Sequence, residues 1–476
     1  MLEQSFSAKN FEDVFNTENR KGLFDITHFS DSYQECCAYI KALREGQHAL
    51  KRKKKIHWTD EEKENYKEWE DCIKSLLCQK NQICQNDLDQ IAEKINNPSF
   101  RFRLNKGFAN GSIVYMVDDD NESYFAIKQL QSNIRRTFNV KAANRHSIMA
   151  QLKLLLNDNY PKFIIRTDVT HFFESIPHDK LLDCVENNTL LSVKSKKFIR
   201  AILSEYDNVK DVDADNPLEQ GIPRGVGISS YLSELYMKDF DEEIRKRPEV
   251  LFYARYVDDI FILISHIPLG KSIQDYYQEI VDKFNLKGLV LKKEGDDKCS
   301  LINLSQETGS PINTTITYLG YKLYVEKQDR KTTVKFGLSD NKIDKLKQRI
   351  DSCIDHFKQI SRFDIKRARK ELIWGLKLTT GNVRLSNTKK GIKAGVFYSN
   401  NLLDIDYISD LDNLTTYLHG KFPIPHSKIF ASRTEKGNYV KSLRKRIQKF
   451  DFAENWKTRK MYDLSLQQLN NIKGWL

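Results

Sequence analysis

Two apolar runs flank a pair of adjacent aspartates near the middle of the chain. The runs span residues 251–257 and 260–264 and are rich in β-branched and aromatic residues, which favour strands. Two strand-like runs separated by two polar residues predict a tight hairpin with Asp258 and Asp259 at its tip. A third run, Lys162–Val169, predicts a buried strand that carries an aspartate near its end.

We expect the aspartate of this third run, Asp168, to approach the hairpin if the strands are neighbours. Adjacent carboxylates repel each other, and proteins tolerate such a group mostly where a divalent cation neutralises it. Three carboxylates can hold two Mg²⁺ ions, the arrangement that serves phosphoryl transfer. Asp118, Asp119 and Asp120 also follow a short apolar run, but polar residues come next, so that segment is interpreted as a solvated turn.

Helical patterns dominate both ends of the chain. Glu61–Cys78 is densely charged and free of Gly and Pro, and apolar residues recur at helical spacing over 340–375. The middle of the chain mixes strands with helices, and Tyr124–Ile127 is interpreted as strand-like. The pattern predicts an α+β fold. Its three expected parts are a helical N-terminal extension at residues 1–98, a mixed core at 99–335 and a helical C-terminal part at 336–476.

The charge of the chain is compatible with a polyanionic substrate. Lys and Arg number 77 against 65 Asp and Glu, which gives a net charge of +12. Basic residues cluster at 51–55 and again at 441–449. The first cluster is interpreted either as an RNA contact or as a solvated run of charge. Since no run approaches the roughly 20 apolar residues of a membrane span, we expect a cytoplasmic protein without membrane contact. The spacing of the eight cysteines fits neither a zinc site nor a disulfide framework, so buried free thiols are expected.

Five ordered blocks resemble those of reverse transcriptases and together extend over about half of the chain. A single block of this kind is weak, whereas five in the right order are specific. The blocks are, in chain order, Asp168–Phe173, Gly221–Ser230, Tyr256–Asp259, Gly288–Leu291 with a following lysine, and Thr317–Tyr321.

The resemblance implies a right-hand polymerase fold with fingers, an antiparallel palm sheet and a thumb, extended by helices at both ends. A lysine after the fourth block is implied to protonate the leaving pyrophosphate. Lys298 fits the family spacing best, with Lys292 and Lys293 as alternatives. The residues implied to bind two Mg²⁺ ions are Asp168, Val169, Asp258 and Asp259, and the three aspartates are also the implied catalytic groups.

The resemblance also implies a nucleotide site. Phe173 stands where the family places an aromatic side chain that excludes a ribose 2′-hydroxyl, although a core phenylalanine is the alternative. Arg224 and Gly225 belong to a glycine-rich loop implied to lie against the incoming nucleotide and the template base. Most relatives carry a glutamine in place of Arg224, which puts the usual nucleotide contact in doubt. Tyr256 opens the third block beside the catalytic pair.

Two further candidates precede the first block. Lys128 and Arg145 are the residues expected to grip the triphosphate and the template backbone, with a solvated basic helix face as the alternative. The glycine-rich loop is expected to lead into a helix that starts near Ser229; the alternative is an ordinary loop in which Ser229 or Ser230 serves as a helix cap. Tyr318–Tyr321 is expected to form the turn that holds the primer strand.

The resemblance implies an RNA-directed DNA polymerase that uses deoxynucleoside triphosphates, an RNA template and a DNA product. Residues 376–476 show no nuclease or zinc-finger spacing, which favours the bacterial enzymes of phage defence, working with a noncoding RNA. A homo-oligomer or a second defence protein is a further partner left open. The alternatives are a retron or mobile-element reverse transcriptase and, more distantly, a non-catalytic RNA-binding scaffold with a polymerase fold.

Overall fold

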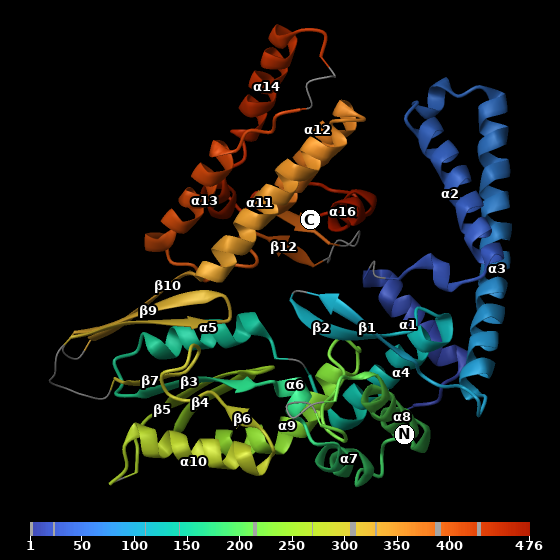
Figure 1. The fold of residues 1–476 in the computed structure, drawn as a ribbon. Coiled ribbons are helices and arrows are strands. Elements are labelled where there is room, and N and C mark those ends of the chain that lie inside the picture. The colour runs from blue at the N-terminus through green and yellow to red at the C-terminus, as the bar shows by residue number, and fades with distance from the viewer. Residues whose placement is uncertain are drawn as a thin grey trace.

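The computed structural model describes residues 3–21, 24–109, 111–141, 143–212, 217–268, 270–304, 311–328, 331–385, 392–425 and 430–476. Helices and antiparallel sheets are mixed along the chain, so the predicted α+β class is confirmed. In Figure 1 a central sheet lies at the bottom of the view, with the C-terminal helices above it and the N-terminal helices along one side.

Three helices form the N-terminal part, as the charged and Gly-free pattern predicted. They are α1 (Ala8–Lys21), α2 (Asp31–Lys51) and α3 (Asp60–Asn96), with the short 3-10 helices η1 (Ile26–His28) and η2 (Lys55–His57) between them. A capping box starts α3, because Thr59 and Glu62 each accept the other's backbone N–H. Phe11 of α1 packs against Phe125 with ring centroids 5.5 Å apart, which joins this part to the next.

A hairpin and two helices follow the N-terminal part. They are β1 (Leu104–Ala109), β2 (Ser112–Val117), α4 (Asn121–Phe138) and α5 (Arg145–Leu156). The prediction of a strand at Tyr124–Ile127 was wrong, since these residues lie in the first turns of α4. Asp120 caps α4 by accepting the N–H of Ser123, and the aromatic and branched side chains of this stretch serve the buried face of the helix. The predicted turn at Asp118–Asp120 is confirmed.

The central sheet has the strand order β4-β5-β3-β6, and a further strand, β7, pairs with β3. All of these pairs are antiparallel, and Phe163 pairs with Ile264 at one end and Asp168 with Asp259 at the other. This pairing confirms the expectation that the strand of the third apolar run lies next to the hairpin. The strands are β3 (Phe163–Thr170), β4 (Val250–Tyr256), β5 (Asp259–Ile264), β6 (Val290–Leu291) and β7 (Ser300–Asn303).

Both faces of this sheet are covered, which explains why β5 is apolar throughout. Ile260 and Ile262 belong to the core shared with the N-terminal helices, and Phe261 and Leu263 belong to a second core on the opposite face. The helices around the sheet and its loops are α6 (Phe172–Ser175), α7 (His178–Glu186), α8 (Val193–Val209), α9 (Ser229–Arg245) and α10 (Ile273–Leu286).

A three-stranded antiparallel sheet covers the second face together with α5. Its strands are β8 (Ile312–Tyr318), β9 (Tyr321–Gln328) and β10 (Lys331–Leu338). Ser339 alone separates β10 from α11 (Asp340–Ile360), and α12 (Ile365–Thr380) packs against α11 as the helical spacing predicted.

The remaining elements belong to the C-terminal part, and several of them share a separate core with α11 and α12. They are β11 (Asn382–Arg384), β12 (Lys393–Gly395), η3 (Ile405–Tyr407), α13 (Ser409–Gly420), α14 (Arg433–Ile447), α15 (Phe452–Lys457) and α16 (Leu466–Lys473). No described helix is both long and apolar enough to cross a membrane. The expected domain boundaries at 98 and 335 remain predictions.

The expectation of buried thiols was only partly right. All eight cysteines are free, and four of them are buried, but Cys72 and Cys78 are exposed. Both lie on α3, whose outer face points away from α2 over this stretch. A helix with one packed face leaves such residues open to water whatever their polarity.

Candidate active site

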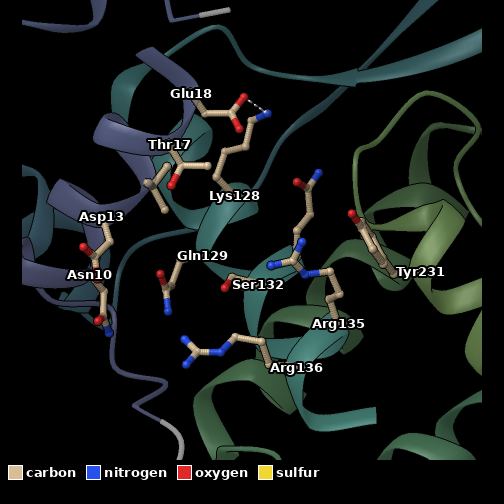
Figure 2. Close-up of a pocket in the computed structure, with 12 residues that line it drawn as sticks. Asn10, Asp13, Thr17, Glu18, Lys128, Gln129, Ser132, Arg135, Arg136 and Tyr231 are labelled. Atoms are coloured by element: carbon tan, nitrogen blue, oxygen red, sulfur yellow. Dashed lines mark hydrogen bonds and ion pairs between the residues drawn. The ribbon is translucent and has the colours of Figure 1, made fainter. Parts of the chain in front are cut away.

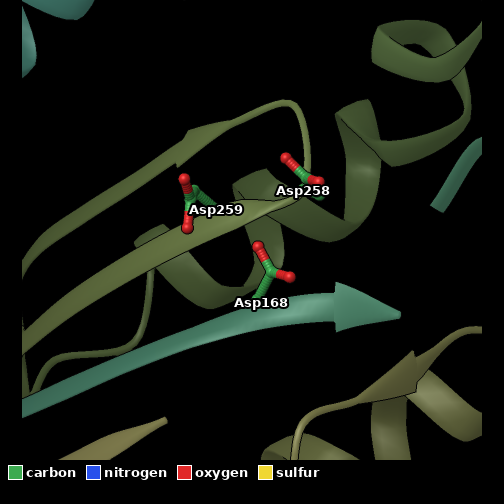
Figure 3. Close-up of side chains that lie close together, drawn as sticks. All are labelled: Asp168, Asp258 and Asp259. Atoms are coloured by element: carbon green, nitrogen blue, oxygen red, sulfur yellow. The ribbon is translucent and has the colours of Figure 1, made fainter. Parts of the chain in front are cut away.

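Three carboxylates meet where β3 passes the β4–β5 hairpin (Figure 3). One oxygen from each of Asp168, Asp258 and Asp259 lies within 4.8 Å of the others. Asp168 is buried near the end of β3 and is paired across the sheet with Asp259, the first residue of β5. Among the described residues, these acids are the single group of three or more potential ligands with such spacing.

The hairpin turn brings Asp258 into this group. Tyr256 pairs with Asp259, so the turn consists of Val257 and Asp258, and the predicted tight hairpin is confirmed. Asp258 alone lies in the turn, whereas Asp259 already belongs to β5. The main-chain N–H of Val169 donates to the Asp258 carbonyl oxygen over 3.0 Å, which fixes the turn against β3.

Two cations accompany the carboxylates. Lys298 Nζ lies 3.1 and 3.2 Å from the two carboxylate oxygens of Asp168. Arg166 Nη2 lies 2.8 Å from Oδ1 of Asp259, and its side chain is almost completely buried. Sequence reasoning missed Arg166, although its place two residues before Asp168 puts both side chains on one face of the strand.

Burial and mutual repulsion alter the protonation of the acids. Burial raises the pKa of Asp259 to about 6, and the charges of Asp168 and Asp258 act in the same direction, against Arg166 and Lys298. Burial, followed by the charge of Asp168, also raises the pKa of Asp258. Burial acts to lower the pKa of the Lys298 ammonium, but the hydrogen bonds and charge of Asp168 outweigh it and the pKa is raised. The site therefore favours bound positive charge.

The acids suit a divalent cation, because they offer hard oxygen ligands. Arg166 and Lys298 supply two positive charges for the three carboxylates, so the negative charge is not fully neutralised. Val169, predicted as a further ligand, has a buried side chain and uses its N–H on Asp258, so its carbonyl oxygen is the group that a cation would contact. Of the three candidate lysines, Lys298 is the one that touches an acid of the triad through its side chain. Lys292 instead donates its main-chain N–H to the Asp168 carbonyl over 3.0 Å.

Phe173 and Arg224 lie together beside the triad. The Arg224 guanidinium carbon lies 5.7 Å from the centre of the Phe173 ring, and Nη2 lies 3.1 Å from Oε1 of Glu174. The charge of Arg224 also acts to lower the pKa of Asp258, although burial of Asp258 prevails. Phe172, the neighbour of Phe173, is buried and lies in the short helix α6.

The glycine-rich loop packs against β2. Gly225 has φ +106°, and a Cβ built there would lie 2.7 Å from the carbonyl oxygen of Tyr115, so this position requires glycine. The main-chain N–H of Tyr115 also donates to the Arg224 carbonyl over 2.6 Å. The helix after the loop begins at Ser229 as predicted, but no serine caps it. Ser229 Oγ donates to the Pro223 carbonyl over 2.7 Å instead.

Lys128 and Arg145, the two residues expected to grip the triphosphate and the template backbone, lie at different places. Lys128 forms an ion pair with Glu18 of α1 at 2.9 Å and lines a polar cavity with Arg135 and Arg136 (Figure 2). Asn139, with φ +51°, ends α4 and redirects the chain before α5. Arg145 is consequently separated from the cavity of Lys128.

Arg145 instead contacts the turn between β8 and β9. Its Nε donates to the Leu319 carbonyl over 2.6 Å, and its guanidinium lies 4.9 Å from the centre of the Tyr321 ring. A cavity of about 820 Å³ extends from there to the triad, lined among others by Arg145, Tyr256, Asp259, Lys298 and Lys342. The structure therefore brings Tyr256, Lys298 and Arg145 to one cavity and leaves Lys128 outside it.

Comparisons with known proteins agree with this geometry. Residues 63–323, more than half of the chain, match the sequence profile of the family described as reverse transcriptase (RNA-dependent DNA polymerase). No curated protein matches the chain significantly.

Solved structures similar to the chain include telomerases of two yeasts. A C-terminally truncated apo telomerase from Candida tropicalis has a TM-score of 0.34 and 15% identity over 51% of this chain and 56% of that chain. Telomerase from Candida albicans, in complex with a fragment of telomeric RNA, has a TM-score of 0.33 and 12% identity over 75% and 62%. The chain thus spans less than two thirds of either telomerase chain. Because the family profile covers most of the sheet and all three aspartates, the chain belongs to the reverse transcriptase (RNA-dependent DNA polymerase) family.

Proposed function

We propose that the protein is an RNA-directed DNA polymerase that adds deoxynucleotides to a primer end by phosphoryl transfer. The observation that carries the proposal is the meeting of Asp168, Asp258 and Asp259 within 4.8 Å at the end of β3. The family match supports this function, and the intact set of three acids speaks against a non-catalytic scaffold.

The groups proposed to hold two Mg²⁺ ions are the carboxylates of Asp168, Asp258 and Asp259 and the carbonyl oxygen of Val169. When bound, such ions lower the pKa of an attacking hydroxyl and neutralise charge that develops on the phosphates. Mg²⁺ suits these ligands because it prefers carboxylate oxygens and shares its coordination shell with substrate phosphates.

The surrounding residues have distinct proposed roles. Lys298 keeps its proton because of Asp168 and is proposed to donate it to the leaving pyrophosphate. Arg166 holds the Asp259 carboxylate in place from the neighbouring strand. Phe173 is proposed to exclude a 2′-hydroxyl, while Arg224 lies over its ring and supplies positive charge for the nucleotide.

Nucleic-acid binding is proposed to use the basic surface of the protein. The net charge of +12 favours a polyanion, and Arg135 and Arg136 are exposed beside Tyr231 in the cavity of Figure 2. Side chains of this kind bind phosphates and stack on bases. A single-stranded RNA template is the partner proposed for this surface.

The biological role proposed is bacterial phage defence with a partner noncoding RNA. Its support is the resemblance in sequence. In particular, Arg224 stands in place of the usual glutamine, and residues 376–476 do not show the residue spacing of a nuclease. Sequencing the nucleic acid that copurifies with the protein from its native locus, before and after adding deoxynucleotides and Mg²⁺, tests this role. A product templated by a retron-type structured RNA would replace it with the mobile-element alternative.

Replacing Asp258 and Asp259 tests the catalytic proposal. Asp258→Ala together with Asp259→Ala is expected to abolish deoxynucleotide incorporation while the fold and RNA binding persist. The matched control is Asp118→Ala with Asp119→Ala, which removes two acids from the turn before α4 and should leave incorporation unchanged. Retained synthesis in the first variant would refute the site.

A further inference from the structure

Arg255 lies beneath the catalytic turn and is almost completely buried. It is the penultimate residue of β4, two positions before Val257. Its guanidinium uses all five of its N–H donors. Nε lies 3.1 Å from both carboxylate oxygens of Asp241, Nη1 donates to Glu234 Oε1 and the Val257 carbonyl, and Nη2 donates to Glu234 Oε2 and Asp241 Oδ2.

Both acids belong to α9, which contacts β4. Glu234 and Asp241 are seven residues apart and therefore lie on the same face of the helix. Asp241 also accepts the Tyr253 hydroxyl over 2.6 Å, and the Arg255 guanidinium lies 5.7 Å from the centre of the Phe172 ring. The arginine is thus held rigidly by elements on three sides.

The carbonyl that Arg255 contacts belongs to a strained residue. Val257 has φ +63°, in the left-handed region that favours glycine and that a β-branched side chain rarely adopts. Such a conformation persists only where the surroundings hold it. Arg255 Nη1 contacts the Val257 carbonyl over 3.0 Å, and the N–H of Val169 contacts the next carbonyl, that of Asp258, over 3.0 Å. Both carbonyl groups of the turn are therefore anchored.

We propose that Arg255 is a positioning residue that holds the Val257–Asp258 turn in its strained conformation and so keeps Asp258 beside Asp168. The inference rests on the proposed function, because it assigns the arginine to the same carboxylate site. Glu234 and Asp241 orient the guanidinium, and the turn carbonyl receives the one N–H that the two acids leave available.

The shape of the side chain matters more than its charge. A lysine has three donors on a single nitrogen and cannot reach two acids and a carbonyl in the directions of a planar fork. Arg255→Lys keeps the buried charge and removes the hold on the turn. Val257→Gly removes the strain itself, because glycine adopts positive φ without a Cβ clash. The two changes should therefore compensate each other.

The experiment measures Mn²⁺ binding to the full-length protein by electron paramagnetic resonance, alongside deoxynucleotide incorporation. Arg255→Lys should weaken Mn²⁺ binding and lower kcat by roughly ten- to a hundredfold, the loss expected for one charged hydrogen bond. Adding Val257→Gly should recover most of both losses. Arg245→Lys on the same helix, whose exposed guanidinium lies over the Tyr253 ring, is the matched control and should change neither.

Glu234→Gln is a second test variant, which keeps the proposal testable if Arg255→Lys fails to fold. It keeps the arginine but removes a charged acceptor, so it should show a smaller loss that Val257→Gly again reverses. Unchanged Mn²⁺ affinity in both Arg255→Lys and Glu234→Gln, or no recovery by Val257→Gly, would show that Arg255 serves only the core. A different result would overturn the proposed function: the unmodified protein binds Mn²⁺ through the three aspartates but incorporates no deoxynucleotide. The positioning role of Arg255 would then still be tested by the Mn²⁺ affinity of the variants.

Discussion

Arg166 on β3 donates to the carboxylate of Asp259 on the neighbouring strand across 2.8 Å, beside the pairing of Asp168 with Asp259. Asp168 has its own cation in Lys298 at 3.1 Å. Among the residues that the structure describes, no ion pair includes Asp258. The turn acid is therefore the one whose charge depends most on a bound cation.

Metal stabilisation is expected to grow as pH rises. Burial raises the pKa of Asp259 to about 6 from 3.8, so the folded protein binds this proton more tightly than the unfolded chain. Without metal, stability should fall as pH rises from about 4 through 6, because the proton that favours folding is lost. The Mg²⁺ proposed for this site would replace that proton, so the increase in Tm on adding Mg²⁺ should be small at pH 5 and larger at pH 8.

Thermal denaturation at several pH values, with and without Mg²⁺, measures this dependence. The control is Asp258→Asn with Asp259→Asn, which should make the Mg²⁺ effect small at every pH. A shift of equal size at pH 5 and pH 8 in the unmodified protein would place the metal elsewhere.

Phe173→Ala is expected to relax sugar selection. The ring is half-buried beside Arg224, and its removal opens space where a 2′-hydroxyl is proposed to be excluded. Incorporation of ribonucleotides relative to deoxynucleotides should rise. Phe172→Leu is the control, since Phe172 is buried and should cost stability without changing discrimination. An unchanged ratio for Phe173→Ala would leave it a core residue.

Arg224→Gln, which restores the residue common among relatives, is expected to raise KM for deoxynucleotides more than it lowers kcat. The guanidinium charge next to the proposed nucleotide site is lost, and a charged contact contributes roughly 1.5–3 kcal/mol. Glu174→Gln frees the arginine from its ion pair and should change KM less. Steady-state kinetics with both variants measure the effect, and an unaltered KM in Arg224→Gln would remove Arg224 from the nucleotide site.

Arg135→Ala with Arg136→Ala is expected to weaken binding of single-stranded RNA. If both arginines contact phosphates, the slope of log K against log salt should fall by about 1.4, since each phosphate contact contributes about 0.7 on a single strand. Lys63→Ala with Lys67→Ala on α3 is the control of equal charge. Equal losses in both variants would indicate a general charge effect and no specific surface.

Gly225→Ala is expected to destabilise the fold by more than Gly270→Ala. Both glycines have positive φ, but a Cβ at Gly270 meets nothing within 4 Å, whereas one at Gly225 meets the Tyr115 carbonyl at 2.7 Å. At Gly270 the cost of the methyl group is backbone strain of about 1 kcal/mol. At Gly225 a clash with the backbone is added to that strain. Urea denaturation of the two variants gives the difference, and equal costs would mean that the loop moves to accept the methyl group.

The features of the site that the sequence predicts are those set by short stretches of chain. Runs of β-branched and aromatic residues predicted β3 and the hairpin and placed the acids near the strand ends, so the meeting of the acids follows from strand pairing. The strand expected at Tyr124–Ile127 failed because Asp120 caps a helix there, and amphipathic packing overrode local propensity.

The partners of the acids were not predictable in the same way. Glu234 and Asp241 reach Arg255 from a helix 14 to 21 residues away in sequence, and Lys128 meets Glu18 across 110 positions. Such contacts depend on how elements pack, and a single sequence gives no sign of them. The separation of Lys128 from Arg145 was likewise not predictable, because it depends on the turn at Asn139.

The shared core of the N-terminal helices and the sheet limits how far this enzyme can be shortened. Phe11 and Leu88 pack in the same cluster as Phe125 of α4 and as Ile260 and Ile262 of β5, the strand that begins at Asp259. A fragment that starts near residue 99 would expose this apolar surface to water and aggregate before it could polymerise. The N-terminal helices are thus an obligatory part of any minimal catalytic fragment.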